Sequence, residues 1–162
     1  MKKYLDKLDK QILSLISCNA RMPFLDVARK CDVSGAAIHQ RVQRLMQLGV
    51  VRGSQFVVDT SKIGYNTCAF IGVQVADMSK YRDVIKAISD IPEVVECHAT
   101  TGPYALFIKL YAHNNRNLRD IIVDRISMIP GVGGTETLHI SLDELMSRQI
   151  ATFDGDIILL DD

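Results

Sequence analysis

The sequence has few of the features that mark metal centres, secreted proteins or membrane proteins. Its four cysteines lie far apart and form no Cys-x-x-Cys pair, which is poor spacing for zinc or for a redox dithiol. We expect reduced thiols that behave as small apolar residues. No apolar run is long enough to cross a membrane, and Lys2 and Lys3 are followed by charged residues where a signal peptide would have an apolar run. The expectation is a cytoplasmic protein with no metal, cofactor or membrane partner.

The sequence also lacks the motifs of common enzyme classes. It contains no Gly-x-Ser-x-Gly, no Walker-type loop and no Gly-x-Gly-x-x-Gly. The histidines His39, His98, His113 and His139 lie in separate predicted elements. His98 and His139 could approach each other on adjacent strands, but no carboxylate or thiol at ligand spacing accompanies them. Structural histidines are the better interpretation, and catalysis is unsupported.

Charge is balanced over the whole chain but not within it. The 162 residues carry 19 Lys and Arg and 19 Asp and Glu. Residues 1–59 hold ten basic and five acidic residues, whereas residues 60–162 hold nine and fourteen. A basic half joined to an acidic half indicates one part that binds a polyanion and another part with a different task.

The basic half has the pattern of three short helices. Apolar residues at helical spacing predict a first helix from roughly Leu5 to Ser17. Pro23 sets a boundary before a second helix at about Phe24–Lys30. The residues that the second helix is expected to bury are Phe24 or Leu25, Val27 and Ala28.

The third predicted helix has two contrasting faces. Ser34 can cap its first turn, and Gly49 ends it. One face is apolar, and the other carries small residues, amides and arginines, which read base edges and contact phosphates. Three helices in this order predict a helix-turn-helix unit; the alternative is any small three-helix bundle. The candidate DNA-contacting residues are Ser34, Ala36, His39, Gln40, Arg41, Gln43 and Arg44.

The two arginines of this helix have more than one possible role. Arg41 and Arg44 would hold phosphates or brace the end of the helix. Arg41 could instead pack towards the first helix. After the helix, Val50–Asp59 contains two β-prone runs around Gly53-Ser54, which predict a small hairpin or one long kinked strand.

From Tyr65 onward the pattern alternates between strands and helices. The joints Ile91-Pro92-Glu93-Val94 and Ile129-Pro130-Gly131-Val132 repeat one another, because each proline stops a helix and the following valine opens a strand. The order βαββαβ predicts a ferredoxin-like domain, so the fold class is α+β. The expected strands are 67–75, 94–100, 104–111 and 135–142, and the expected helices are 79–90 and 117–127.

A sheet of this kind packs helices on one face and leaves the other face to be covered. The second face is expected to carry several apolar side chains, which predicts a dimer built by a partner sheet. Its residues would be Phe70, Gly72, Gln74, Phe107, Lys109 and Tyr111. In the tail, Asp154-Gly155-Asp156 between apolar runs predicts a hairpin.

The loop Thr100–Tyr104 is the one candidate for a small ligand. Gly102 permits close backbone approach, and free N–H groups with hydroxyls could hold a carboxylate. The alternative is a plain β-turn, since Gly-Pro is a turn dipeptide. The candidate effector residues are Thr101, Gly102, Pro103, Tyr104, Ala105, Thr135 and Thr137.

Taken in order, these segments resemble the Lrp/AsnC family, also called feast/famine regulators, nearly to Leu142. In the first half the matching residues are Leu8-Asp9, Ile12-Leu13, Asn19-Ala20-Arg21, Val33-Ser34, Arg41-Val42, Arg44-Leu45 and Gly49-Val50-Val51. In the second half they are Ile63-Gly64, Pro92-Glu93-Val94-Val95-Glu96-Cys97, Thr101-Gly102, Tyr104, Ile129-Pro130-Gly131-Val132, Thr135 and Thr137.

The resemblance implies a sequence-specific, nucleoid-associated transcription regulator whose partner is double-stranded DNA. It implies a winged-helix-like helix-turn-helix domain (1–50), a linker strand (51–62), a ferredoxin-like domain of the RAM or ACT-like type (63–142) and a tail (143–162). Such proteins form homodimers that assemble into tetramers or octamers, and amino acids or related molecules bind near the Gly-x-Tyr loop. The alternative is an architectural DNA-binding or oligomeric ligand-sensing module without strong sequence specificity.

The chain departs from the family in that loop. Members usually have Gly-Asp-Tyr-Asp, and this chain has Gly102-Pro103-Tyr104-Ala105. Both carboxylates are gone, and an aspartate is a natural partner for the ammonium group of an amino acid. The resemblance therefore implies a different effector, or none.

Overall fold

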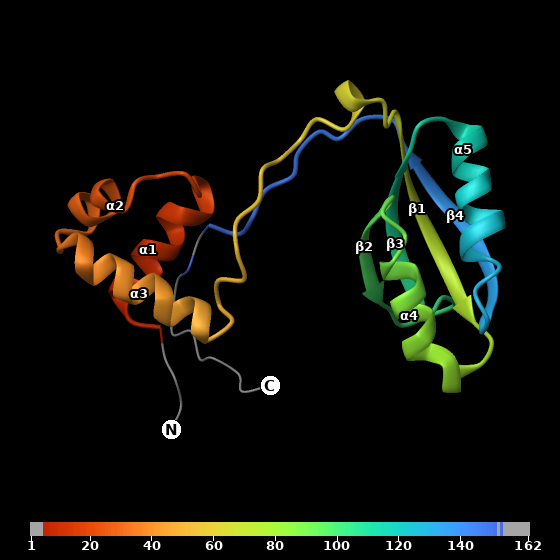
Figure 1. The fold of residues 1–162 in the computed structure, drawn as a ribbon, viewed down its shortest axis with the longest axis horizontal. Helices are drawn as coiled ribbons and strands as arrows, with labels where there is room; N and C mark the ends of the chain where they lie inside the picture. The colour runs from red at the N-terminus through yellow and green to blue at the C-terminus, as the bar shows by residue number, and fades with distance from the viewer. Residues whose placement is uncertain (1–4, 152, 154–162) are drawn as a thin grey trace. The chain divides into compact units, whose positions relative to one another are not determined.

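The computed structural model describes residues 5–151 and Phe153, and its chain forms two compact units (Figure 1). The helical unit takes the chain through Phe56 and again from Met146. The sheet unit is Val57–Leu145. The hairpin predicted around Asp154-Gly155-Asp156 lies outside the described residues.

The helical unit contains the three predicted helices, α1 (Lys7–Cys18), α2 (Phe24–Cys31) and α3 (Gly35–Gln47). Asp6 caps α1, because its side chain accepts the Asp9 N–H at 2.8 Å while the Asp9 side chain accepts the Asp6 N–H at 3.2 Å. This reciprocal pair satisfies two backbone donors that a helix start leaves open. The buried apolar core of the unit is Leu5, Ile12, Leu13, Val27, Ala28, Ile38, Val42 and Leu45.

One expectation for α2 is wrong. Val27 and Ala28 are buried, but Phe24 is 38% exposed and Leu25 is 66% exposed. Phe24 lies in the first turn of α2, and its ring contacts His39 edge-on, with the ring centroids 5.9 Å apart. The end of a short helix projects past the core, so helical spacing alone did not decide which residues are buried.

The segment between the units forms no strand. Residues 51–59 have no strand assignment, and Phe56, Val57 and Val58 are all exposed. An extended segment becomes a strand only when a neighbour pairs with its backbone, and no other part of the described chain does so here. The predicted hairpin is therefore wrong, and the linker strand expected within 51–62 is not formed by the single chain. A short 3-10 helix, η1 (Ser61–Ile63), follows instead.

The sheet unit has the predicted ferredoxin-like topology. Its strands are β1 (Thr67–Val75), β2 (Val94–Ala99), β3 (Leu106–Ala112) and β4 (Val132–Ser141). They are antiparallel in the order β2-β3-β1-β4. The strand order shows that β2 and β4 are opposite edges, so the suggestion that His98 and His139 approach each other on adjacent strands is wrong.

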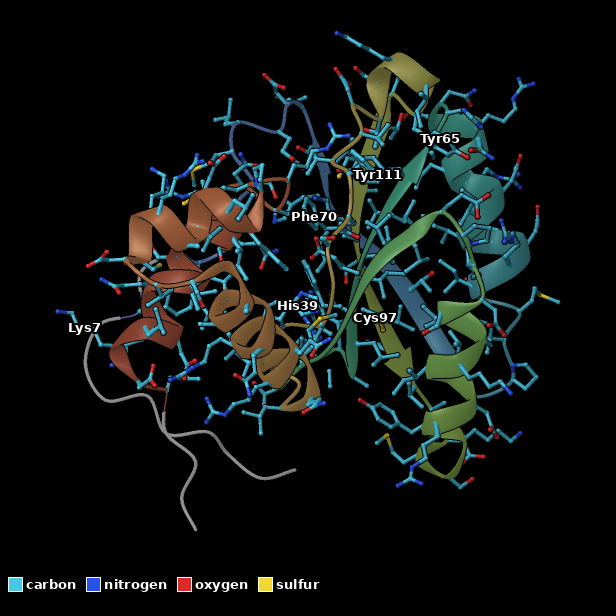
Figure 2. The ribbon with its side chains drawn as sticks, turned by 60° about the vertical axis from the view of Figure 1, so that its left-hand side comes forward. Lys7, His39, Tyr65, Phe70, Cys97 and Tyr111 are labelled. Atoms are coloured by element: carbon cyan, nitrogen blue, oxygen red, sulfur yellow. The ribbon has the colours of Figure 1, made fainter. Side chains whose placement is uncertain are left out.

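Two helices cover one face of this sheet (Figures 1 and 2). A 3-10 turn, η2 (Met78–Lys80), leads into α4 (Tyr81–Ser89), and α5 (Asn115–Asp120) continues as a π-helical segment, η3 (Ile121–Ile126). The repeated joints are confirmed, because Val94 donates to the Ile91 carbonyl and Val132 to the Ile129 carbonyl, both at 3.0 Å. The buried core is Ala69, Ile71, Val73, Val84, Ile88, Ile91, Leu106, Ile108, Leu110, Ala112, Leu118, Ile121 and Ile126.

Candidate DNA-binding and effector sites

The third helix presents the expected polar face. The Ser34 hydroxyl accepts the Ala37 N–H at 3.2 Å, which caps α3 as predicted. The buried stripe of Ile38, Val42 and Leu45 leaves the other side of the helix in solvent. The exposed residues of α3 include Ala36, His39, Gln40, Gln43 and Gln47.

The glutamines among these exposed side chains line a hollow along α3. It is bordered by Gln40, Gln43 and Gln47, with Arg41 and Arg44 beside them. The Gln43 amide nitrogen lies 3.1 Å from Nε2 of His39, one helical turn earlier. Amide donors and acceptors spaced along an exposed helix are suited to hydrogen bonds with base edges in the major groove.

The two arginines of α3 contact α1. Arg41 donates to Asp6 and, at 3.1 Å, to Oδ1 of Asp9. Arg44 donates to Oδ2 of Asp9 at 2.9 Å. The Asp9 side chain is fully buried, whereas those of Arg41 and Arg44 are 34% and 41% exposed. The packing of Arg41 towards the first helix, considered above as its alternative role, is therefore present, and Arg44 makes a similar contact that the sequence analysis did not predict.

The charges of this cluster stabilise one another. Burial disfavours the charged form of Asp6, but hydrogen bonds from the Asp9 N–H and the Arg41 guanidinium outweigh it and hold the pKa of Asp6 below its usual value. The hydrogen bond to Asp6 raises the pKa of Arg41 in turn. Two carboxylates thus neutralise two guanidinium groups, so less positive charge is left on α3 to attract phosphates.

Asp9 is a residue whose role the sequence reasoning missed. It lies at helical spacing between Leu5 and Ile12, on the apolar face of α1. Acidic side chains are almost never fully buried unless they are paired. A carboxylate on the apolar face of α1, together with the arginines of α3, indicates an ion pair between these two helices.

The candidate effector loop is a closed turn between β2 and β3. The Thr100 hydroxyl donates to the Tyr104 carbonyl at 2.9 Å, and the Thr100 N–H donates to the Ala105 carbonyl at 3.1 Å. Gly102 has a φ of +108°, which residues with a Cβ rarely adopt. The structure thus brings together Thr101, Gly102, Pro103, Tyr104 and Ala105 in one turn.

Tyr104 folds from this loop onto the sheet. Its ring lies over Gly72, where an added Cβ would come within 2.6 Å of ring atoms. Its hydroxyl donates to the carboxylate of Glu136 on β4, and that hydrogen bond raises the pKa of Tyr104. Glu136 is therefore a carboxylate near the loop that sequence reasoning missed, and only the pairing of Gly72 with Glu136 across β1 and β4 reveals it.

The structure does not bring the other two effector candidates to the loop within one chain. Thr135 pairs with Val73, whose side chain is in the core beneath the helices, and its hydroxyl lies 3.1 Å from that of Ser127. Thr137 pairs with Ile71, another core residue. Successive strand residues point to opposite faces, so both threonines lie on the face away from Tyr104 and Glu136.

The uncovered face of the sheet carries aromatic side chains and one lysine. Phe70 and Phe107 stack with their centroids 5.8 Å apart, and Figure 2 labels Phe70 and Tyr111 on the side of the sheet away from α4 and α5. Gly72 was expected to contribute to this open face, but the ring of Tyr104 covers it. The rest of the expected face is largely apolar and is not covered by any described residue of the chain's own helices.

Lys109 is the main charge on this face. Its side chain is only 15% exposed, and its Nζ lies 3.1 Å from Glu144, 3.8 Å from Glu96 and 5.4 Å from the centre of the Tyr111 ring. Desolvation disfavours the charged lysine, but the hydrogen bonds to Glu144 and Tyr111 outweigh it, so the pKa of Lys109 is raised. The lysine is therefore already neutralised in the single chain.

The described part of the chain has neither a membrane-spanning helix nor a metal-binding cluster. No helix there has the length and apolar character needed to cross a bilayer. No cluster of three or more His, Cys, Asp and Glu side chains there has the geometry to hold a metal ion.

Comparison with known proteins identifies both units. The profile described as "Lrp/AsnC ligand binding domain" matches residues 68–151, and that described as "Winged helix-turn-helix DNA-binding" matches residues 5–52. Regulatory protein AsnC of Haemophilus influenzae is 36% identical over 146 residues, which span 90% of this chain and 97% of that protein. HTH-type transcriptional regulator FL11 of Pyrococcus horikoshii is 32% identical over 138 residues, 85% and 90% of the two chains.

Solved structures give the same result. Escherichia coli AsnC aligns with a TM-score of 0.81 at 31% identity, over 91% of this chain and 98% of its own. The leucine response regulatory protein LrpA of Mycobacterium tuberculosis aligns with a TM-score of 0.81 at 26% identity, over 90% and 99% of the two chains. The order of the two domains is the one that the motifs predicted.

Proposed function

The chain belongs to the Lrp/AsnC family and is a sequence-specific DNA-binding transcription regulator, and we propose that its α3 reads the operator through Ala36, His39, Gln40 and Gln43. The observation that carries this proposal is the amide-lined hollow on the solvent side of α3. Its glutamines carry both donors and acceptors, which bidentate contacts to adenine require. The protein would act by binding, without catalysis, on chromosomal DNA in the cytoplasm.

Arg41 and Arg44 would act mainly as positioning residues in this mechanism. Their bonds to Asp9 join α3 to α1, so they set the angle at which the polar face meets the groove. Both guanidinium groups are partly exposed and retain N–H donors for phosphates at the edge of the contact. Arg44→Ala would therefore weaken DNA binding and loosen the helical unit together.

The test of base reading is a substitution on the polar face. Gln40→Ala should lower discrimination between the preferred operator and unrelated DNA by ~1–3 kcal/mol, the value of one bidentate base contact. Gln11→Ala, an exposed glutamine on α1, is the matched control and should leave discrimination unchanged. Binding-site selection with both variants measures the difference. An unchanged site preference for Gln40→Ala would contradict the assignment.

The open sheet face supports a homodimer, which would be the building block of tetramers or octamers. Phe70, Phe107 and Tyr111 form an apolar surface, and a second copy of the same sheet would cover it symmetrically. Phe107→Glu should shift sedimentation to the monomer, because an unpaired carboxylate would then enter the interface. Met128→Glu, at a residue 72% exposed on the loop after η3, is the control and should leave the dimer intact.

The loop at residues 101–105 supports an effector site for an amino acid or a related small molecule. Glu136 would supply the carboxylate that the loop itself lacks, because it accepts a hydrogen bond from the Tyr104 hydroxyl and therefore lies beside the loop. A ligand that binds only the folded protein raises its melting temperature by mass action. A thermal-shift panel of amino acids should give at least one stabilising ligand, and Glu136→Gln should reduce that shift. A panel with no effect would contradict the proposal.

A further inference from the structure

The chain returns to the helical unit after the sheet unit and contacts it at Phe153. The chain from Met146 onward groups with the residues up to Phe56. Phe153 is half-buried and packs against the apolar core formed by α1, α2 and α3. Partial burial of this large aromatic side chain favours the contact between the segment and the core.

The sequence after this anchor is unlike the rest of the chain. The matched ligand-binding domain ends at residue 151, so Phe153 and the nine residues after it are an addition to that domain. Those nine residues contain four aspartates and no Lys or Arg. Residues 1–56, to which the anchor is attached, contain ten Lys and Arg and four Asp.

The tail is long enough to reach the DNA-binding face from its anchor. Nine extended residues span up to ~30 Å, whereas α3, with 13 residues, is ~20 Å long. Any position on α3 is thus within reach of a tail held at the helical core. A short tether of this kind gives an effective local concentration on the order of millimolar.

The chemistry of the tail also matches the surface of the helical unit. Carboxylates accept hydrogen bonds from the amide and guanidinium groups that line the hollow on α3. The apolar run Ile157–Leu160 between the aspartates has counterparts in Phe24, Leu25 and Met46, which are exposed large apolar side chains of the same unit. Both the charges and the apolar residues of the tail therefore have partners on this unit.

We propose that the nine residues after Phe153 dock on the DNA-binding surface of the helical unit and compete with DNA for it. The proposal rests on the proposed role of α3 in DNA binding. The aspartates take the place of phosphates, and Phe153 keeps them close to α3. DNA must displace the tail, so the apparent affinity for DNA equals the intrinsic affinity multiplied by the fraction of molecules in which the surface is free.

The test compares the full chain with a variant that stops at Phe153. A tail that occupies the surface for ~80–90% of the time predicts that truncation tightens DNA binding roughly fivefold to tenfold at low salt. The gain should shrink as salt rises, because screening weakens the attraction between the tail and the basic unit. Fluorescence anisotropy with a labelled duplex, at two salt concentrations, measures both effects.

A full-length variant separates charge from length. D154N/D156N/D161N/D162N keeps the tail but removes its charge, and it should bind DNA as the truncated variant does. A synthetic peptide of residues 154–162, added to the truncated variant, should restore inhibition, and the peptide with the four asparagines should not. These reagents leave every residue of the DNA-binding helices unchanged.

Three results decide the matter. Equal DNA affinity for the full chain, the truncated chain and the asparagine variant would overturn the proposal. So would a change of oligomeric state on truncation with no change in DNA affinity, since the tail would then pair with a sheet edge. If no form of the protein binds duplex DNA, the proposed reading role of α3 fails as well, which distinguishes the two failures.

Discussion

Asp9 joins α1 to α3, the proposed reading helix, and its removal should loosen α3 while leaving the side chains on its solvent face unchanged. Asp9 is fully buried and accepts hydrogen bonds from Arg41 at 3.1 Å and from Arg44 at 2.9 Å. Asp9→Asn keeps the size of the side chain and one acceptor oxygen. It removes the negative charge that both guanidinium groups share.

The size of the effect follows from burial. Breaking a buried ion pair by removing one partner costs ~3–5 kcal/mol, because a charge is left uncompensated. Here the arginine side chains are 34% and 41% exposed, so water can solvate them once they are released. The remaining amide oxygen also still accepts one bond. We therefore expect ~2 kcal/mol, below the range for a fully buried pair.

A matched control lies in the same unit. Asp26 occupies the first turn of α2 as Asp9 does that of α1, and its bond to Arg29 is also 2.9 Å long. The side chains of that pair are 46% and 79% exposed. Exposed pairs of this kind contribute ~0–0.5 kcal/mol, so Asp26→Asn should have little effect.

Hydrogen exchange of the full-length protein, read by mass spectrometry, measures the change locally. A loss of ~2 kcal/mol in opening free energy should make the amides of α1 and α3 exchange roughly thirtyfold faster. The amides of β3 in the other unit are the internal reference and should be unaffected. Exchange in α3 that is unchanged in Asp9→Asn, or that rises equally in Asp26→Asn, would refute the reasoning.

Three further predictions concern the sheet unit and the thiols. Gly72→Ala should destabilise the fold by ~1–3 kcal/mol and so lower the melting temperature, because the new Cβ meets the Tyr104 ring at 2.6 Å. In the control Gly134→Ala, the new Cβ meets only the end of the Gln74 side chain, at 3.2 Å. Equal melting temperatures for the two variants would contradict this prediction. The hydrogen bond from Lys109 lowers the pKa of Glu144, so the pair stabilises the fold above the usual carboxyl pKa of 4.5 and loses that contribution as pH falls through the lowered pKa. Carboxyl titration by NMR should show the pKa of Glu144 returning towards its usual value in Lys109→Met, and no change would contradict the pairing. Cys18 is exposed, whereas burial raises the thiol pKa of Cys68 and Cys97, so a thiol reagent should label Cys18 first, and a fast phase that survives Cys18→Ser would contradict this.

Much of the fold could be predicted because its signals are local. The cap at Ser34, the apolar stripe of α3 and the proline joints at Pro92 and Pro130 each depend on residues within one or two turns. Such signals act on the backbone wherever the segment lies in the chain. The wrong predictions concern residues whose structure depends on a pairing partner that is distant in the sequence. Val57 has strand chemistry but lacks a strand to pair with, and the expected approach of His98 to His139 depends on the strand order, which puts β2 and β4 at opposite edges.

The candidate site was predicted in part for the same reason. The exposed residues of α3, such as Gln40 and Gln43, follow from helical spacing alone, and the turn at Gly102 follows from its residue types. The partners of Arg41 and Arg44 could not be predicted in this way. The buried carboxylate of Asp9 is 35 positions away from Arg44, and only the packing of the helices brings the two together. Within one chain, Thr135 and Thr137 lie on the other face of the sheet from Tyr104, because the faces of β4 depend on its register with β1.

The sequence by itself determined the helices, the strands, the two-part charge distribution and the resemblance to a family of DNA-binding regulators. These properties reside in short windows, where periodicity, capping and turn chemistry act between neighbours along the chain. Only the tertiary structure decided that Asp9 holds the reading helix, that Glu136 meets Tyr104 from 32 positions away, and that Phe153 returns to the helical core. Each of these contacts depends on packing and strand register, which bring together residues that no local window contains.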